Sequence, residues 1–387
     1  MNVADIPLAL YVHLPWCVRK CPYCDFNSHT APQALPELAY RRALIADLDS
    51  QLDLVQGRAL VSIFFGGGTP SLLSPAFYAG LLQDIAERVG SDADCEVTLE
   101  ANPGTMEHGD WAAYRAAGIN RVSLGVQSFD DGILTALGRI HGGADARQAI
   151  ATLRQAGFTR INLDLMHGLP GQDLAAALHD LRQALAQEPE QISWYQLTLE
   201  PNTVFYRQRP RLPEAEILEA IDAEGSALLQ AAGYAQYEVS AWARGRACAH
   251  NLNYWTFGDY LAIGAGAHGK ATREGQIWRY QQSRLPADYL RAMDSGRHAE
   301  RQIVAAGELP FEFFMNALRL RQGVDRALFE QRTGCSTALA EHCLAPARQQ
   351  GLIADDSQRW RCTDLGYRFL NRVLDQLVDN LAHADGQ

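Results

Sequence analysis

Three cysteines near the N-terminus have a spacing that suits an iron–sulfur cluster. Cys17, Cys21 and Cys24 form a C-x3-C-x2-C motif, and three thiolates can hold three irons of a [4Fe–4S] cubane. The fourth iron then lacks a protein ligand, and the amino and carboxylate groups of S-adenosylmethionine (SAM) have the shape to occupy it. We therefore predict a [4Fe–4S] cluster with SAM chelated to its open iron. The alternative is a zinc site that His13 or His29 completes.

A glycine-rich turn follows the next apolar run. Gly66, Gly67 and Gly68 precede Thr69, directly after residues 60–65. Glycines let the backbone approach a ligand closely, and exposed amides can hydrogen-bond its polar groups. The alternative is a tight strand–helix turn. Because this turn comes one βα unit after the cysteine motif, it favours a ligand site.

These residues must be positioned by strands that alternate with helices. The expected strands are residues 8–14, 60–65, 96–102, 121–128, 160–166 and 191–198, and the helices include 36–54, 75–89, 106–117 and 174–186. Apolar strands separated by amphipathic helices indicate a parallel sheet covered by helices. Six such units predict an α/β fold, a closed or incomplete β/α barrel. Barrel chemistry lies at the C-terminal ends of the strands, where Cys17, Glu100 and Gln127 fall, while Asp164 lies inside the fifth strand.

The pattern changes after residues 286–306. Helices are expected at 310–321, 325–332, 338–350 and 365–381, with a short hairpin at 352–362. Helices with a two-stranded wing resemble a winged-helix module. We therefore expect a barrel core at 1–240, a segment that completes the barrel and connects it at 241–307, and a small, mainly helical winged-helix-like domain at 308–387.

Composition is typical of a soluble protein, with 47% apolar and 20% charged residues among 387. The net charge of −11 disfavours nucleic acid as a partner. No signal peptide and no apolar run of about 18 residues is recognisable, so we expect a cytoplasmic protein without a membrane span. Peripheral association with a membrane is compatible with this sequence. In the cytoplasm the cysteines should be reduced.

Further segments give the chain a family resemblance. They are GGGTPS (66–71), SLGVQSF (123–129), LGRIH (137–141), NLDLMHGLPGQ (162–172), YQLTLEPNT (195–203), HNLNYW (250–255) and IGAGAH (263–268). With the cysteine motif, they make the chain resemble radical SAM proteins of the oxygen-independent coproporphyrinogen III oxidase superfamily, and most of all the HemW-type haem chaperones within it. The resemblance covers nearly all of residues 6–380 and implies a radical SAM partial β/α barrel.

The resemblance also implies roles for residues around SAM. Tyr11 and Tyr23 would flank SAM and the cluster, and Glu100 would hydrogen-bond the ribose or methionyl portion. The remaining positions are Gly67, Gly68 and Thr69, which would hold the amino group, and Gln127, Arg139 and Asp164, which would complete the pocket. Each has a structural alternative, because a polar group inside a barrel can simply be satisfied by hydrogen bonds and Arg139 could be a surface charge.

The segment HNLNYW implies a haem site. A neutral imidazole is a common axial ligand of haem iron, which gives His250 a role. Tyr254 and Trp255 could pack on the macrocycle and bond a propionate, with Asn251 beside them, and Cys248 could be an alternative thiolate ligand. The structural alternative is a histidine packed beneath the barrel among core aromatics.

Departures from the oxidases favour a haem chaperone. The oxidases carry a fourth cysteine where this sequence has Phe26, and an N-terminal extension where only ten residues precede Tyr11. The leading hypothesis is a protein that binds haem and transfers it to apo-haemoproteins. The alternatives are an oxygen-independent coproporphyrinogen III oxidase, which decarboxylates its substrate through a SAM-derived radical, and a radical SAM protein that acts on nucleic acid. Oxidase activity is therefore not expected.

Overall fold

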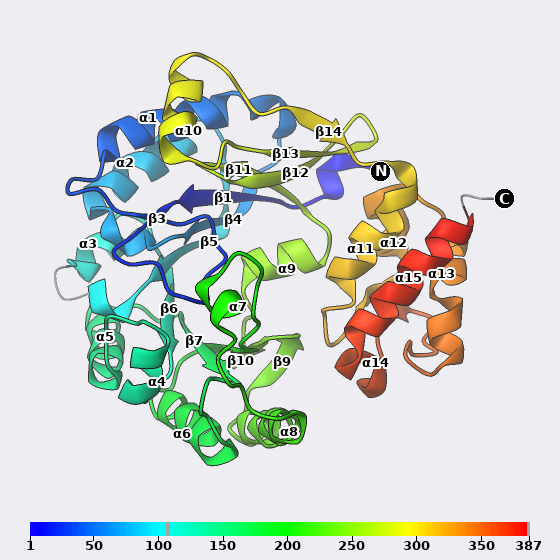
Figure 1. The fold of residues 1–387 in the computed structure, drawn as a ribbon. Helices are drawn as coiled ribbons and strands as arrows, with labels where there is room; N and C mark the ends of the chain where they lie inside the picture. Colours follow the sequence, from blue (N-terminus) through cyan, green and yellow to red (C-terminus); the bar gives the residue numbers. More distant parts are fainter. Residues whose placement is uncertain (106–108, 385–387) are drawn as a thin grey trace.

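The computed structural model describes residues 1–105 and 109–384. Its centre is a curved twelve-stranded sheet in the order β14-β13-β12-β11-β1-β4-β5-β6-β7-β8-β10-β9 (Figure 1). The strands are β1 (Leu8–Leu14), β4 (Leu60–Gly67), β5 (Ser91–Ala101), β6 (Arg121–Gln127), β7 (Ile161–His167), β8 (Gln191–Gln196), β9 (Ala235–Glu238), β10 (Ala241–Ala243), β11 (Asp259–Ile263), β12 (His268–Arg273), β13 (Gln276–Gln281) and β14 (Arg301–Ile303). Two small sheets pair β2 (Trp16–Cys17) with β3 (His29–Thr30), and β15 (Val324–Asp325) with β16 (Arg359–Trp360).

Helices cover the outer face of the sheet and build a separate C-terminal unit (Figure 1). They are α1 (Glu37–Asp49), α2 (Pro75–Ala86), α3 (Trp111–Ala116), α4 (Asp131–Ala136), α5 (Gly143–Gln155), α6 (Leu174–Leu185), α7 (Val204–Gln208), α8 (Ala215–Ala231), α9 (Ala249–Trp255), α10 (Pro286–Asp294), α11 (Leu309–Ala317), α12 (Arg326–Thr333), α13 (Thr337–Gln349), α14 (Asp364–Arg368) and α15 (Leu370–Ala384). Within the described ranges, no helix has both the length and the apolarity to cross a membrane.

The predicted parallel sheet is confirmed. The six strands expected from the sequence are β1, β4, β5, β6, β7 and β8, and each pairs in parallel with the next. This order follows because successive βα units with the same handedness place each strand beside its predecessor. The sheet continues beyond the prediction, with β11 parallel to β1 and β10 antiparallel to β8. It ends at β14 and β9, so in the described chain the barrel is partial.

Two helices are shorter than the sequence expectations. The helix expected at 106–117 begins at Trp111, because the Asp110 carboxylate accepts a hydrogen bond from the Ala113 amide at 2.9 Å. Residues 106–108 of that expectation lie outside the described residues. The helix expected at 36–54 ends at Asp49, and a short 3-10 turn follows.

The C-terminal helices have their own hydrophobic core, which includes Phe313, Phe314, Phe329 and Trp360. The hairpin expected at 352–362 is reduced to a single bridge between Ile353 and Cys362, because β16 pairs instead with β15, which precedes α12. The helix expected at 365–381 is divided into α14 and α15 at Phe369, whose backbone leaves the helical region.

Candidate cofactor site

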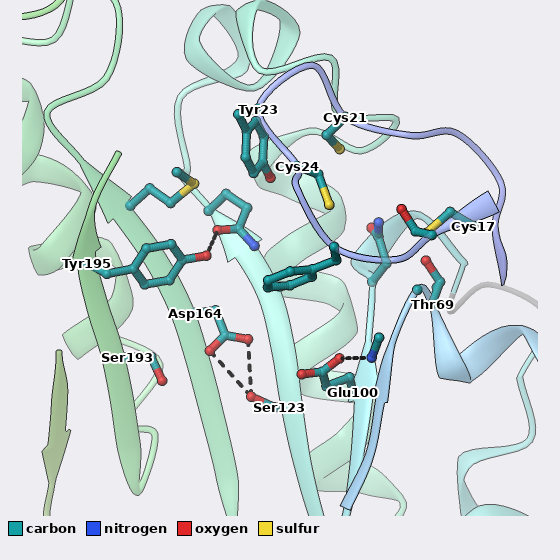
Figure 2. Close-up of a pocket in the computed structure, with 18 of the residues that line it drawn as sticks. Cys17, Cys21, Tyr23, Cys24, Thr69, Glu100, Ser123, Asp164, Ser193 and Tyr195 are labelled. Carbon is teal, nitrogen blue, oxygen red and sulfur yellow. Dashed lines mark hydrogen bonds between the residues drawn. The ribbon is translucent and has the colours of Figure 1, made fainter. Parts of the chain in front are cut away.

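The three cysteines lie on one loop above the C-terminal ends of the strands. Cys17 ends β2, and the chain returns through β3, where the Ala31 amide donates to the Cys17 carbonyl at 2.8 Å. Cys17, Cys21 and Cys24 all line a cavity of about 820 Å³. Figure 2 shows them on the opposite side of this cavity from Asp164. All three are free thiols, and burial raises the pKa of Cys17 and of Cys24.

The surroundings of the thiols bear on the choice between a cluster and the zinc alternative. Among the described residues, no three His, Cys, Asp or Glu side chains lie close enough to hold a single metal ion, whereas in a cubane each thiolate binds a different iron. Both ring nitrogens of His13 are engaged, Nδ1 with the Tyr11 hydroxyl at 3.0 Å and Nε2 with the Asn27 carbonyl at 2.8 Å. His13 therefore supports the loop, and completing a zinc site would require it to break one of these hydrogen bonds.

The segment IGAGAH anchors the far end of the cysteine loop. The Asn27 side-chain amide donates to the carbonyl of Ala265 and to that of Arg284, each at 2.9 Å. A Cβ on Gly266 would lie only 2.2 Å from the Asn27 amide nitrogen. Glycine at 266 is therefore what lets the loop seat here, and this motif positions the cluster ligands without touching them.

The glycine run differs from its expected role. Its amides were expected to face a ligand, but they are used internally: Gly67 N–H donates to the Glu100 carboxylate at 3.1 Å, Gly68 N–H to Leu14 and Thr69 N–H to Trp16. Gly67 has φ +112°, and a Cβ there would lie 2.4 Å from the His13 ring. Glycine is therefore required here primarily because the His13 ring packs closely against Gly67 beneath the cysteine loop. An ammonium group needs acceptors, which the carbonyls of this turn and the Thr69 hydroxyl can supply.

Alternate residues of the central strands build the polar wall of the cavity. The Asp164 carboxylate accepts from Ser123 Oγ at 3.1 Å (Figure 2). It also accepts from Asn162 Nδ2 at 2.7 Å. The Tyr195 hydroxyl donates to Gln127 Oε1 at 2.8 Å. Gln127 has φ +70°, beside a register shift between β6 and β7. A side chain held in the left-handed region costs about 1–2 kcal/mol, so the barrel fold itself holds this amide toward the site.

Two acids in this cavity resist ionisation. The pKa of Glu100 is raised to about 8, first by burial and then by the neighbouring Asp164 charge. Burial also raises the pKa of Asp164, against the hydrogen bonds that it accepts. Arg139 lies close by, with Nη2 donating to the Gly125 carbonyl at 2.8 Å and Nη1 at 3.5 Å from Cys21 Sγ. The cavity can therefore take up a cationic ligand, since positive charge would favour the carboxylate forms.

The structure brings most of the sequence-predicted SAM residues together. The cavity is lined by Tyr23, Gly67, Gly68, Thr69, Glu100, Gln127, Arg139 and Asp164. Tyr11 is not among the lining residues; it lies behind the glycine run, bonded to His13.

The predicted haem residues are divided between the cavity and the core. Cys248 and Asn251 line the cavity, whereas His250 is 2% exposed. The His250 ring stacks on Phe64 with centroids 4.8 Å apart, and its nitrogens lie 2.9 Å from Ser62 Oγ and 2.9 Å from the Tyr254 hydroxyl. Burial lowers the pKa of His250 to about 3, so the ring is neutral. Iron ligation by His250 therefore requires that at least one of these hydrogen bonds breaks.

Cys248 is poorly suited to be the alternative haem ligand. Its thiol donates to the Glu96 carboxylate at 3.2 Å, and burial raises its pKa to about 12. The thiolate, which is the form that ligates iron, is therefore strongly disfavoured. Trp255 packs against the C-terminal core, and Arg319 lies over its ring at 4.3 Å.

Sequence reasoning missed several cavity residues. They are Phe64, Arg121, Ser123, Asn162, Met166, Ser193, Tyr195 and Arg319. The missed signal is periodicity: in strands that are otherwise apolar, Ser123 lies between Val122 and Leu124, and Ser193 lies between Ile192 and Trp194. Alternate residues of a strand face the same side, so polar residues at period two mark the barrel interior.

Comparisons with known proteins agree with this arrangement. Residues 11–184 match the radical SAM superfamily, and residues 304–369 match the HemN C-terminal domain. Proteins named heme chaperone HemW from Haemophilus influenzae and from Escherichia coli are each 48% identical to this chain, over 95% of it and 97% of their own length. The solved coproporphyrinogen III oxidase HemN of Escherichia coli superposes with a TM-score of 0.81 at 24% identity, covering 97% of this chain and 90% of that one. That structural likeness concerns the fold.

Proposed function

Because the chain belongs to the HemW family of radical SAM proteins, we propose that it is a haem chaperone that binds haem and transfers it to apo-haemoproteins. The observation that carries this proposal is the 48% identity to proteins named heme chaperone HemW over nearly the whole chain. The cavity supports it, because about 820 Å³ is within the range of sites for small organic ligands.

In this proposal the cluster and SAM would share one barrel mouth. Cys17, Cys21 and Cys24 would hold three irons, and the bound cluster supplies an open position on its fourth iron for SAM. The proposed SAM residues are Tyr23, Gly67, Gly68, Thr69, Glu100, Gln127, Arg139 and Asp164, with Tyr11 supporting the wall from behind. The carboxyl groups would take the cationic part of the ligand, and Arg139 offers a planar fork to its carboxylate.

Haem would be taken up on the α9 side of the cavity. We propose that His250 ligates the iron after its ring leaves Ser62 or Tyr254, and that Asn251, Tyr254 and Trp255 contact the macrocycle. The neutral imidazole supports this role, since the neutral ring is the form that binds metal.

We also propose where the protein acts and which partners it has. We place the protein in the cytoplasm, and we expect its partners to be haem and apo-haemoprotein acceptors. The net charge of −11 disfavours nucleic acid.

We also propose that the domain boundaries lie between residues 240 and 241 and between residues 307 and 308. The second is supported by the separate hydrophobic core of the C-terminal helices.

Two assays on the cluster-loaded protein test the proposal. Haemin should bind with a shifted Soret band, and the loaded protein should then activate a haem-free acceptor such as an apo-peroxidase. Under anaerobic reducing conditions with SAM, coproporphyrinogen III should not be decarboxylated. Repeated turnover of coproporphyrinogen, lost on replacement of Cys17, would restore the oxidase alternative.

A further inference from the structure

The cavity has two chemically different ends. Gln127 is the last residue of β6 and lies near the cysteines, whereas Arg121 is the first residue of the same strand, and both line the cavity. The space therefore runs along the barrel interior from the C-terminal to the N-terminal ends of the strands. Beside Arg121, the lining of this second end includes Asn251 and Arg319. This second end therefore carries hydrogen-bond donors of its own, in addition to Arg19, Lys20 and Arg139, which line the same cavity.

Arg319 brings the C-terminal domain into this cavity. It follows α11, and the segment is fixed by main-chain contacts: the Tyr367 hydroxyl donates to the Arg319 carbonyl at 3.0 Å, and Leu320 bridges to Glu238 at the edge of β9. The guanidinium lies 4.3 Å from the centre of the Trp255 ring. Its position is therefore set by the docking of the two domains.

The guanidinium retains capacity for another acceptor. Nη2 donates to Glu238 Oε2 at 3.1 Å. Nε has no hydrogen-bond partner among the described residues, and because it is shielded from solvent, the side chain must shift before a ligand can reach it. A buried N–H without a partner is costly, by about 1–3 kcal/mol. A planar fork with donors to spare is well matched to a carboxylate.

Between the two ends, the wall carries apolar and aromatic side chains, namely Phe64, Met166, Tyr195 and Leu197. A ligand that fits such a cavity has a flat apolar body and carboxylates along one edge, which describes haem with its two propionates. We propose that Arg319 is a specificity-determining residue that binds a haem propionate at the domain junction. This inference rests on the proposed function, and it adds the residue and the domain that bind the carboxylate.

Titration of haemin and of haemin dimethyl ester into the full-length, cluster-loaded protein tests the proposal. The wild type should bind haemin about tenfold more tightly than the ester, as expected for one charge-assisted hydrogen bond. Arg319→Ala should bind both ligands with the same, weaker affinity, and Arg319→Lys should recover only part of the preference. Arg321→Ala is the matched control, because Arg321 lies two residues away, pairs with Asp364 at 2.6 Å and does not line the cavity; it should retain the wild-type preference.

Several results would overturn the proposal. One is a wild type that binds haemin and its ester equally, and another is an Arg319→Ala variant that keeps the preference. Loss of the preference in Arg321→Ala as well would assign the effect to domain docking. A variant that loses SAM binding but not haemin binding would place a different carboxylate at Arg319. A wild type that binds neither porphyrin would refute the haem chaperone function itself, which is a separate outcome.

Discussion

Ser62 Oγ lies 2.9 Å from His250 Nδ1, and this contact ties α9 to the inner face of β4. The other ring nitrogen is held by the Tyr254 hydroxyl one helical turn away, at 2.9 Å. If His250 ligates iron, the structure shows its ring before ligation, because both nitrogens are hydrogen-bonded. The strength of the hydrogen bond that breaks sets the free energy that ligation must overcome.

Ser62→Ala should therefore increase haemin affinity. Removal of one competing hydrogen bond makes release of the His250 ring easier by about 0.5–1.5 kcal/mol, which is up to roughly tenfold in Kd. His250→Ala should weaken haemin binding and change the Soret band, and titrations followed by absorbance measure both effects. Identical spectra and affinities for wild type and His250→Ala would remove His250 as the ligand.

The cysteine loop gives the next prediction. Alanine at Cys17, Cys21 or Cys24 should abolish the charge-transfer absorbance of the anaerobically reconstituted protein, whereas the wild type should contain about four irons and four sulfides per chain. Cys335→Ala is the control, because that thiol is also partly exposed but lies against the C-terminal core. Iron and sulfide analysis measures the cluster content of the wild type and of each variant. Stoichiometric zinc in place of iron would contradict the cluster assignment.

Gly67→Ala should destabilise even the cluster-free protein. A left-handed φ costs an alanine about 1–2 kcal/mol, and overlap of its Cβ with the His13 ring should add about 1–3 kcal/mol. Gly57→Ala is the matched control, because Gly57 also has positive φ but nothing lies within 4 Å of its added Cβ. Urea unfolding gives both values. Equal losses would mean that the packing beneath the loop does not require Gly67.

The Glu100 carboxyl predicts a pH dependence. Its pKa is about 8 in the folded protein and near its ordinary 4.5 in the unfolded chain, so its contribution to stability is complete below about pH 4.5 and is lost as pH rises through 8. Glu100→Gln does not titrate, so its stability relative to wild type should rise over this interval. We expect on the order of 1–3 kcal/mol, because water in the cavity screens part of the effect.

Thermal unfolding of both cluster-free proteins between pH 5 and 9 measures that difference. A stability difference that does not vary with pH would show that Glu100 is ionised throughout. SAM binding should also release protons near pH 8, since a cationic ligand favours the carboxylate.

The sequence by itself determined the six parallel strands, and it predicted the cluster ligands and the residue set around SAM. The strands and the cluster ligands depend on local signals, namely apolar runs of strand length and the spacing of Cys17, Cys21 and Cys24. The residue set around SAM depends on the family resemblance, and the position of several of its members at strand ends supports it. Strand ends meet at one edge of a barrel, so residues distant in sequence, such as Glu100 and Gln127, could be assigned to one site before any contact was known.

Tertiary structure alone decided the surroundings of three other features, namely the glycine run, His250 and Arg319. The amides of Gly67 and Gly68 are internally bonded because Glu100 and Leu14 come to them from other strands. His250 is buried because α9 packs onto β4. Arg319 reaches the cavity because the segment after α11 docks against β9. Each of these facts is a contact between segments far apart in the sequence, and neither composition nor periodicity specifies which partner a polar group will meet when the domains pack.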